Sequence, residues 1–213
     1  AKYINDDNRQ IEDDLLCQII FDPSLYASRL NQKSGVDVIT SSANNYYEGV
    51  NQAEVEAFYA GMAAKDAGNP EPISYGLNSK LMKDASGKIY ENVWKVGGMY
   101  TEAIEQIVYW LEKAATVAKG EQKATIEALI KYYNTGDLKD FDTYNVLWVK
   151  DTDSKIDFVN GFIESYGDPL GMKASWESVV NFKNLEATKR TEIISNNAQW
   201  FEDNSPVDKQ FKK

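Results

Sequence analysis

The spacing of apolar residues changes along this chain, and that change most limits the folds open to it. Over the first two-thirds, apolar side chains recur at helical spacing, as at Ile104, Val108 and Leu111. Farther on, short runs alternate apolar and polar residues, as in residues 176–182. The pattern predicts an α+β fold that is helix-rich, with a short antiparallel sheet mainly in the middle and C-terminal third.

Two helices are expected near the start of the chain. The first has an apolar stripe from Ile11 to Ile20, and we expect Cys17 to pack in the core within it. The second begins after Asn51, because Asn51 and Glu54 form a capping-box pair and Val50 can pack on Val55. Its expected buried residues are Val55, Phe58, Tyr59 and Met62.

The middle of the chain opens with the breaker cluster at residues 68–72. Residues 73–81 are expected to be extended, and residues 84–87 to form a turn. Residues 88–96 fit either a strand or the start of a helix. Two antiparallel helices joined at Gly120 should follow, the second ending near Gly136.

The last third is expected to contain most of the remaining strands. Residues 146–149 and 156–163 are β-prone and flank a turn, so they predict a hairpin. A further strand is expected over residues 176–182. A last helix, capped by Asn184, should run to about Phe201. It should bury Ile194, Ala198 and Phe201.

The aromatic residues are expected to divide between core and surface. We expect core positions for Tyr109, Tyr133, Trp148 and Phe201. Tyr46 and Tyr47 are expected to be the exposed pair. For the chain as a whole, the pattern divides into a helical part at residues 1–66, a mixed α/β lobe at 73–182, and a C-terminal helix and tail at 183–213, or else a single domain.

Composition excludes several classes of function. The chain has no histidine, which removes the commonest metal ligand and general base. Its net charge of −10 argues against binding to nucleic acid or to an anionic membrane surface. A single cysteine cannot form an intrachain disulfide. No secretion signal is expected at the start of the sequence.

The acidic residues between 151 and 164 are the candidates for a site. Asp151, Asp153 and Asp157 resemble a calcium loop, but a plain turn is favoured because Lys155 and Ile156 take the positions of a ligand and a glycine. Asp157 and Glu164 would lie on opposite faces of a strand, so a paired catalytic role is not supported. Gly161 suggests a bulge or a close backbone approach.

The block G-F-I-E-S-Y-G-D-P-L-G, from Gly161 to Gly171, resembles a signature of the dipeptidyl peptidase III family of zinc exopeptidases. The segments L-N-S-K-L (77–81), I-V-Y-W-L-E-K-A (107–114) and L-W-V-K-D (147–151) also resemble that family, in the same order. The resemblance implies a two-lobed enzyme in which strands like these belong to a β-barrel. It also implies cleavage of dipeptides from the N-termini of short peptides in the cytoplasm.

The resemblance assigns zinc to a His-Glu-x-x-Gly-His helix and a later glutamate, and this sequence contains no such motif. The chain would then be a fragment that precedes the zinc motif, binds no catalytic zinc alone, is inactive alone, and partners the remainder of a parent chain. The one residue carried over is Asp157, four positions before Gly161, as the substrate-binding anchor for a peptide's α-ammonium group. Val159 stands where many members have a substrate-contacting tyrosine, and Glu164 receives no role. The alternative is a non-catalytic helical module that binds peptides or acts as a scaffold.

Overall fold

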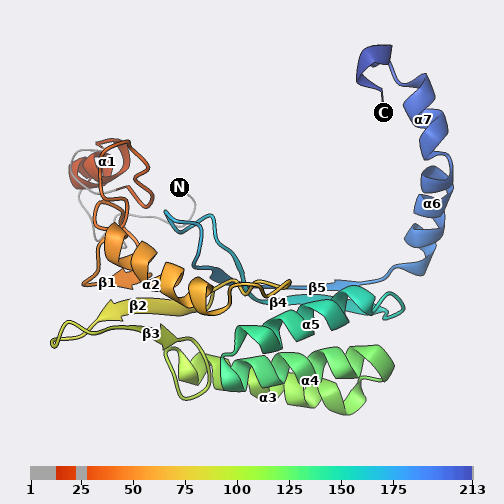
Figure 1. The fold of residues 1–213 in the computed structure, drawn as a ribbon. Helices are drawn as coiled ribbons and strands as arrows, with labels where there is room; N and C mark the ends of the chain where they lie inside the picture. The colour runs from red at the N-terminus through yellow and green to blue at the C-terminus, as the bar shows by residue number, and fades with distance from the viewer. Residues whose placement is uncertain (1–12, 23–27, 213) are drawn as a thin grey trace. The chain divides into compact units, whose positions relative to one another are not determined.

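The structure is a computed structural model, and it describes residues 13–22 and 28–212. Figure 1 shows the order of the helices and strands. The α-helices are α1 (Asp13–Phe21), α2 (Gln52–Lys65), α3 (Thr101–Val117), α4 (Gly120–Thr135), α5 (Leu138–Lys150), α6 (Leu185–Asn196) and α7 (Ala198–Asn204), followed by the 3-10 helix η2 (Lys209–Phe211). The strands are β1 (Tyr47–Glu48), β2 (Ser79–Lys83), β3 (Ile89–Val93), β4 (Ile156–Glu164) and β5 (Ser175–Phe182).

The expected α+β fold is confirmed. One sheet has the order β1-β2-β3, with β1 parallel to β2 and β3 antiparallel to it. The second sheet pairs β4 with β5. Neither sheet closes into a barrel within the described part of the chain.

The chain divides into two compact units. Unit 1 comprises the described residues within Ala1–Thr152 together with Gly161–Glu177, and unit 2 comprises Asp153–Asn160 and the described residues within Ser178–Lys213. The three-part division expected from the sequence stays a prediction. Within the described residues, no helix is both long enough and apolar enough to cross a membrane.

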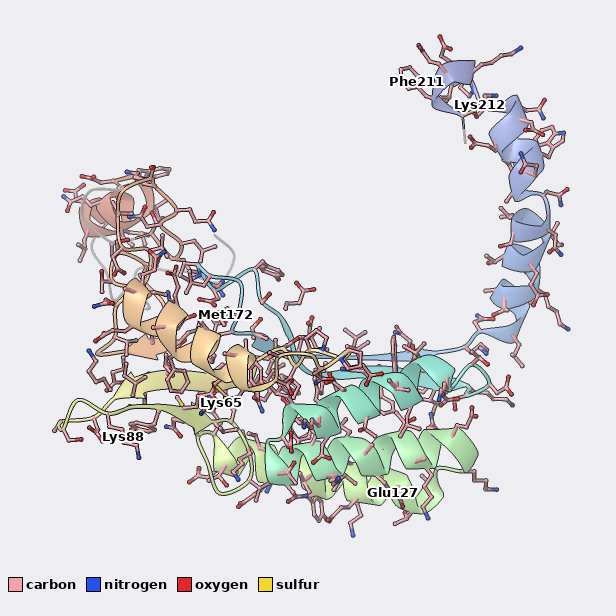
Figure 2. All side chains as sticks on the ribbon, viewed as in Figure 1. Lys65, Lys88, Glu127, Met172, Phe211 and Lys212 are labelled. Atoms are coloured by element: carbon pink, nitrogen blue, oxygen red, sulfur yellow. The ribbon has the colours of Figure 1, made fainter. Side chains whose placement is uncertain are left out.

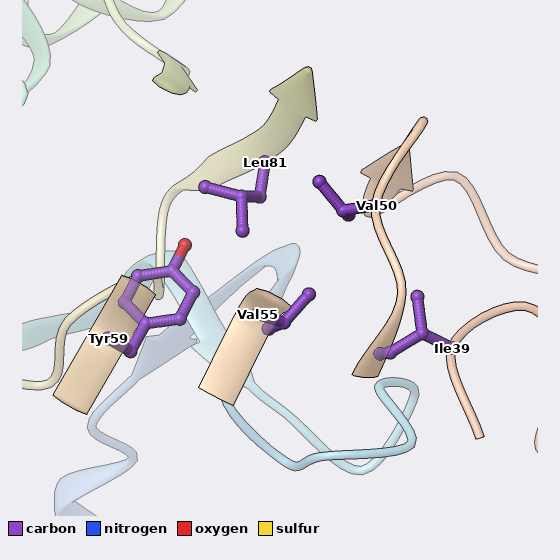
Figure 3. Close-up of a cluster of buried hydrophobic side chains, with 5 residues drawn as sticks. All are labelled: Ile39, Val50, Val55, Tyr59 and Leu81. Carbon is purple, nitrogen blue, oxygen red and sulfur yellow. The ribbon is translucent and has the colours of Figure 1, made fainter. Parts of the chain in front are cut away.

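The first core of unit 1 lies between α2 and the three-stranded sheet. Asn51 and Glu54 form the predicted capping box, and this fixes where α2 begins. Tyr59 of α2 and Leu81 of β2 are buried together in this core (Figure 3). The full buried cluster is Ile39, Val50, Val55, Tyr59 and Leu81. Phe58 and Met62 pack against it while partly exposed, so the predicted face of α2 is confirmed.

The second core of unit 1 is formed by α3, α4 and α5, which lie side by side (Figure 1). Leu129, Tyr132 and Tyr133 of α4 are fully buried there. Gly120 begins α4 in the left-handed region at φ 56°, and Gly136 caps its end, close to both predicted positions. The expected pair of helices is therefore confirmed.

The helix α5 corrects the predicted hairpin. Residues 146–149 are helical, because Asp137 caps the start of α5 and the buried Phe141 and Tyr144 hold it against α4. A four-residue β-prone run cannot outweigh that packing. The partner of β4 is instead β5, which confirms the strand expected at residues 176–182.

The segment around β2 and β3 follows the sequence closely. The Asp84 side chain accepts hydrogen bonds from the backbone N–H groups of Ser86 and Lys88, which makes the expected turn. Residues 88–96, which fit either a strand or a helix by sequence, supply the strand β3. In the expected extended segment 73–81, only the residues from Ser79 onward are in a strand.

The expected core position of Cys17 is wrong. Cys17 is exposed, as are Leu15, Leu16, Ile19 and Ile20 of the same helix α1. Ile11 lies outside the described residues. An apolar stripe forms a core only where another part of the chain covers it, and α1 has no close packing against another described helix or strand.

The expected last helix is correct at its start and wrong in its burial. Asn184 caps α6 by accepting hydrogen bonds from the backbone N–H groups of Glu186 and Ala187. The helix ends at Asn196, and α7 continues after a break at Asn197. Ile194, Ala198 and Phe201 are exposed, and neither helix has a buried residue.

The division of aromatic residues was only partly predicted. Tyr133 is buried as expected, whereas Tyr109 and Phe201 are exposed and Trp148 is half-buried. Tyr46, expected on the surface, is buried, and Tyr47 is half-buried. Tyr46 packs against Trp94, with ring centroids 6.1 Å apart, and the Tyr47 hydroxyl donates a hydrogen bond to Asp168, so each tyrosine has its own buried partner.

Candidate functional site

Asp157 lies on β4 in unit 2 and is exposed to solvent. Glu164 ends the same strand, half-buried, and its carbonyl accepts a hydrogen bond from the Ser175 hydroxyl. The two carboxylates therefore lie at opposite ends of β4, and the structure does not bring them together. Val159 between them is half-buried.

Gly161 confirms the expected close approach. A Cβ atom at this position would lie 2.9 Å from Cε2 of Phe141, so any side chain would collide with the α5 ring. The next residue, Phe162, is buried, with its ring centroid 4.8 Å from that of Trp94. The absence of a side chain at Gly161 thus allows this end of β4 to pack against α5.

The segment after β4 folds back through the motif turn, which we define as residues 167–173. The backbone N–H of Gly171 donates to the carbonyl of Asp168. The buried Asp168 side chain accepts hydrogen bonds from the N–H groups of Met172 (2.8 Å) and Lys173 (3.0 Å) and from the Tyr47 hydroxyl (2.8 Å). Met172, labelled in Figure 2, packs partly buried against the core under α2. The Asp168 side chain therefore fixes the shape of the motif turn and joins it to Tyr47 of β1.

A buried polar network joins the motif turn to the sheet. The Lys173 ammonium donates to the Tyr59 hydroxyl (2.6 Å) and to the Ser79 carbonyl (2.9 Å). Tyr59 and Ser79 in turn donate to Oε1 of Glu91, at 2.9 and 2.6 Å. Sequence reasoning missed this network, because Lys173 lies more than ninety residues from Tyr59 and Ser79 along the chain.

Burial dominates the electrostatics of the network. It raises the pKa of the Tyr47 and Tyr59 hydroxyls well above their ordinary value, and the charges of Asp168 and Glu91 add to that effect. Burial also lowers the pKa of Lys173 to about 8, although Glu91 and Asp168 act in the opposite direction. At neutral pH the lysine is protonated and both phenols keep their protons.

An apolar cavity of about 510 Å³ lies in unit 1 beside Phe162. Its walls are largely aromatic and aliphatic, formed by Tyr46, Trp94, Tyr100, Ile104, Phe162 and Trp176. The backbone of Tyr100 is in the left-handed region, at φ 63°. The indole N–H of Trp176 donates a hydrogen bond of 2.9 Å to the Tyr133 hydroxyl. The lining of the cavity suits an uncharged apolar group.

The possible calcium loop does not form a metal site. Within residues 13–22 and 28–212, no group of three or more histidine, cysteine or acidic side chains could hold a metal ion. Residues 151–155 link the end of α5 to the start of β4, so the hairpin turn expected at Asp151 and Asp153 is not formed.

Comparison with known proteins decides the family. The model of Peptidase family M49 matches residues 43–213, a range that includes the whole Gly161–Gly171 block. The chain belongs to peptidase family M49. The resemblance seen in the sequence is thereby confirmed.

Curated relatives are similar over part of this M49 chain. Dipeptidyl peptidase 3 of Dictyostelium discoideum is 29% identical over 119 residues, which cover 55% of this chain and 17% of that protein. Dipeptidyl peptidase 3 of Rattus norvegicus is 28% identical over 151 residues, covering 68% of this chain and 20% of that protein. The aligned part is thus about a fifth of the length of these relatives.

Two solved structures share the fold. Dipeptidyl peptidase III from Caldithrix abyssi matches with a TM-score of 0.58 and 16% identity, over 95% of this chain and 38% of that chain. The enzyme from Corallococcus sp. strain EGB matches with a TM-score of 0.54 and 20% identity, over 85% of this chain and 32% of that chain. At these identities the likeness supports the fold alone.

The described residues of this M49 chain, 13–22 and 28–212, include no group of side chains that could hold a zinc ion. The sequence has no histidine and one cysteine, and that cysteine is exposed on α1. The described acidic residues form no cluster of three that could replace them. No metal-dependent step is therefore assigned to the residues of this chain.

Proposed function

We propose that this M49 chain supplies part of the peptide-binding region of a zinc-dependent dipeptidyl peptidase, with Asp157 as the anchor for the substrate's free α-ammonium group. The observation that carries the proposal is the family match over residues 43–213. This range includes the Gly161–Gly171 block and the strand β4, which bears Asp157. Hydrolysis itself is assigned to zinc and to groups on the remainder of a longer, parent M49 polypeptide.

The position of Asp157 supports this role. Its carboxylate is on the exposed side of a regular strand, four residues before the motif block. A peptidase that counts two residues from an N-terminus needs an anion to fix the position of the terminal charge. A carboxylate–ammonium hydrogen bond is stronger than a neutral one, by roughly a factor of two.

The proposal predicts a preference for free peptide N-termini. Calorimetry should show that tetra-alanine with a free N-terminus binds the chain more tightly than N-acetylated tetra-alanine. In Asp157→Asn, affinity for the free peptide should fall by up to about fivefold, because an ion pair at a solvent-exposed carboxylate contributes roughly 0.2–1 kcal/mol.

The matched control is Asp153→Asn, which removes the same charge from an exposed position nearby. It should keep the preference for the free N-terminus. Equal binding of the free and acetylated peptides to the unsubstituted chain, or an equal loss in both variants, would rule out Asp157 as the anchor.

The assignment of hydrolysis to other groups has its own test. The 213-residue chain, with zinc added, should release no dipeptide from an arginyl-arginyl reporter. Sustained turnover would contradict the assignment of the chemistry to the remainder of a parent chain, and it would leave the test of Asp157 unaffected.

A further inference from the structure

Lys173 is the most deeply buried charged residue of the described chain, and none of its side chain is exposed. It is the last residue of the motif turn. Its ammonium group contacts α2 through Tyr59 and contacts β2 through Ser79, as well as the carbonyl of Gly76 at 3.2 Å. One side chain therefore ties the turn to two separate elements.

The hydrogen bonds around Lys173 have one consistent direction. A tyrosine hydroxyl has a single proton, and that of Tyr59 is donated to Glu91, so the Tyr59 oxygen accepts from Lys173. The Ser79 hydroxyl likewise donates to Glu91 and accepts from Lys173 at 3.2 Å. The four neighbouring oxygens of the described residues thus all act as acceptors for the ammonium, and a protonated lysine has three N–H groups for them whereas a neutral amine has two.

The network also connects the buried ammonium with the surface. Either of two hydroxyl groups, that of Tyr59 or that of Ser79, bridges the Lys173 ammonium and the Glu91 carboxylate. Glu91 on β3 is half-buried. The titratable groups that face Lys173 from each packed element are Tyr47 of β1, Tyr59 of α2, Glu91 of β3 and Asp168 of the turn. Lys173 also lies over the rings of Tyr47 and Tyr59, 5.4 and 5.0 Å from their centroids.

We propose that Lys173 is a positioning residue and a proton-sensitive switch: its ammonium group fixes the motif turn on α2 and β2, and it exchanges its proton with solvent through Tyr59 or Ser79 and then Glu91. The proposal is independent of the peptide-binding role of Asp157.

The proton transfer conserves every proton. The ammonium gives a proton to the Tyr59 oxygen, while Tyr59 passes its own proton to the Glu91 carboxylate, which releases it to water. The products are a neutral amine, an intact phenol, a carboxylate and a hydrated proton. The neutral amine has one N–H donor fewer for the surrounding acceptor oxygens. At least one hydrogen bond between Lys173 and α2, β2 or Gly76 is therefore weakened or lost.

The direction of the pH effect follows from burial. Because the pKa of Lys173 is about 8 in the folded chain and 10.5 ordinarily, the unfolded chain binds more protons between these values. Stability should therefore rise with pH from about 8, by up to roughly tenfold per pH unit in the folding equilibrium constant. Above about pH 10 the raised pKa of Tyr47 and Tyr59 opposes this rise, because only the unfolded phenols ionise there.

The direct experiment is an NMR titration of the full 213-residue chain, with lysine side chains and backbone amides labelled. One lysine signal should titrate near pH 8, and Lys173→Met should remove it. The amide signals of Met172 and Lys173 should move with the same midpoint, because both N–H groups bond to Asp168 in the turn. In Glu91→Gln the midpoint should fall by about one pH unit, since Glu91 favours the charged lysine.

Lys80→Met is the matched control, because Lys80 lies half-buried on β2 and pairs with Glu48 outside the network. It should leave the titration near pH 8 and the rise in stability unchanged. The proposal fails if no lysine of the unsubstituted chain titrates near pH 8, if the turn amides do not follow it, or if Glu91→Gln leaves the midpoint in place. These readings do not require Lys173→Met to fold.

Discussion

The helices of unit 1 and unit 2 differ in how many of their residues are buried. In unit 1, α2 and α4 bury residues such as Val55 and Leu129 completely. In unit 2, α6 and α7 bury none, and Ile193 and Trp200 remain exposed. Helices of 12 and 7 residues without a buried face are marginal in water. The contrast indicates that the packed core of the described residues lies in unit 1, whereas α6 and α7 of unit 2 have no buried face.

The contrast also concerns the residues with proposed roles, because Asp157 belongs to unit 2 and the motif turn belongs to unit 1. The motif turn is held by a buried network, and its geometry is fixed by the packing of unit 1. Asp157 is exposed, and the helices α6 and α7 of its unit contribute no buried residue.

The largest expected difference is between core truncations in the two units. Leu129→Ala should lower the free energy of unfolding by about 2–5 kcal/mol, because Leu129 is fully buried in α4. Ile194→Ala should change it by less than about 0.5 kcal/mol, because Ile194 is exposed on α6. Urea denaturation followed by circular dichroism measures both. Equal losses would mean that α6 has a covered face.

A smaller difference is expected between two caps with the same chemistry. Asn51→Ala should cost about 1 kcal/mol of global stability, because Asn51 caps α2 and α2 covers the sheet. Asn184→Ala removes the same kind of cap from α6 but should cost less than about 0.5 kcal/mol in the global transition. If Asn184→Ala shifted that transition as far as Asn51→Ala does, the folding of the two units would be coupled.

The parts that could be predicted from sequence are those with local causes. The capping box at Asn51, the Asp84 turn and the helix end at Gly136 each depend on residues within a few positions of one another. The helix α5 could not be predicted, because the packing of the buried Phe141 against the Tyr132 ring of α4 overrides a short β-prone run. The apolar stripes of α1 and α6 predict burial, but a stripe does not show whether anything covers it.

In the candidate site, too, one part has a local sequence signal and the other part does not. Asp157 is found through a motif in one short segment, and the structure places it exposed on β4, whereas its role stays a prediction. The Lys173 network could not be found from sequence, because Tyr59 and Lys173 lie 114 residues apart. A lysine two residues after Asp-Pro-Leu-Gly gives no signal that it is buried.

Native-state hydrogen exchange of the 213-residue chain tests the contrast between the units most directly. We predict that the amides of Leu129 and Tyr132 in α4 exchange only through global unfolding, with protection equal to the full stability of unit 1. The amides of Ile193 and Ile194 in α6 should exchange with almost no protection. Protection in α6 equal to that in α4 would contradict the contrast between the packed helices of unit 1 and the exposed helices of unit 2.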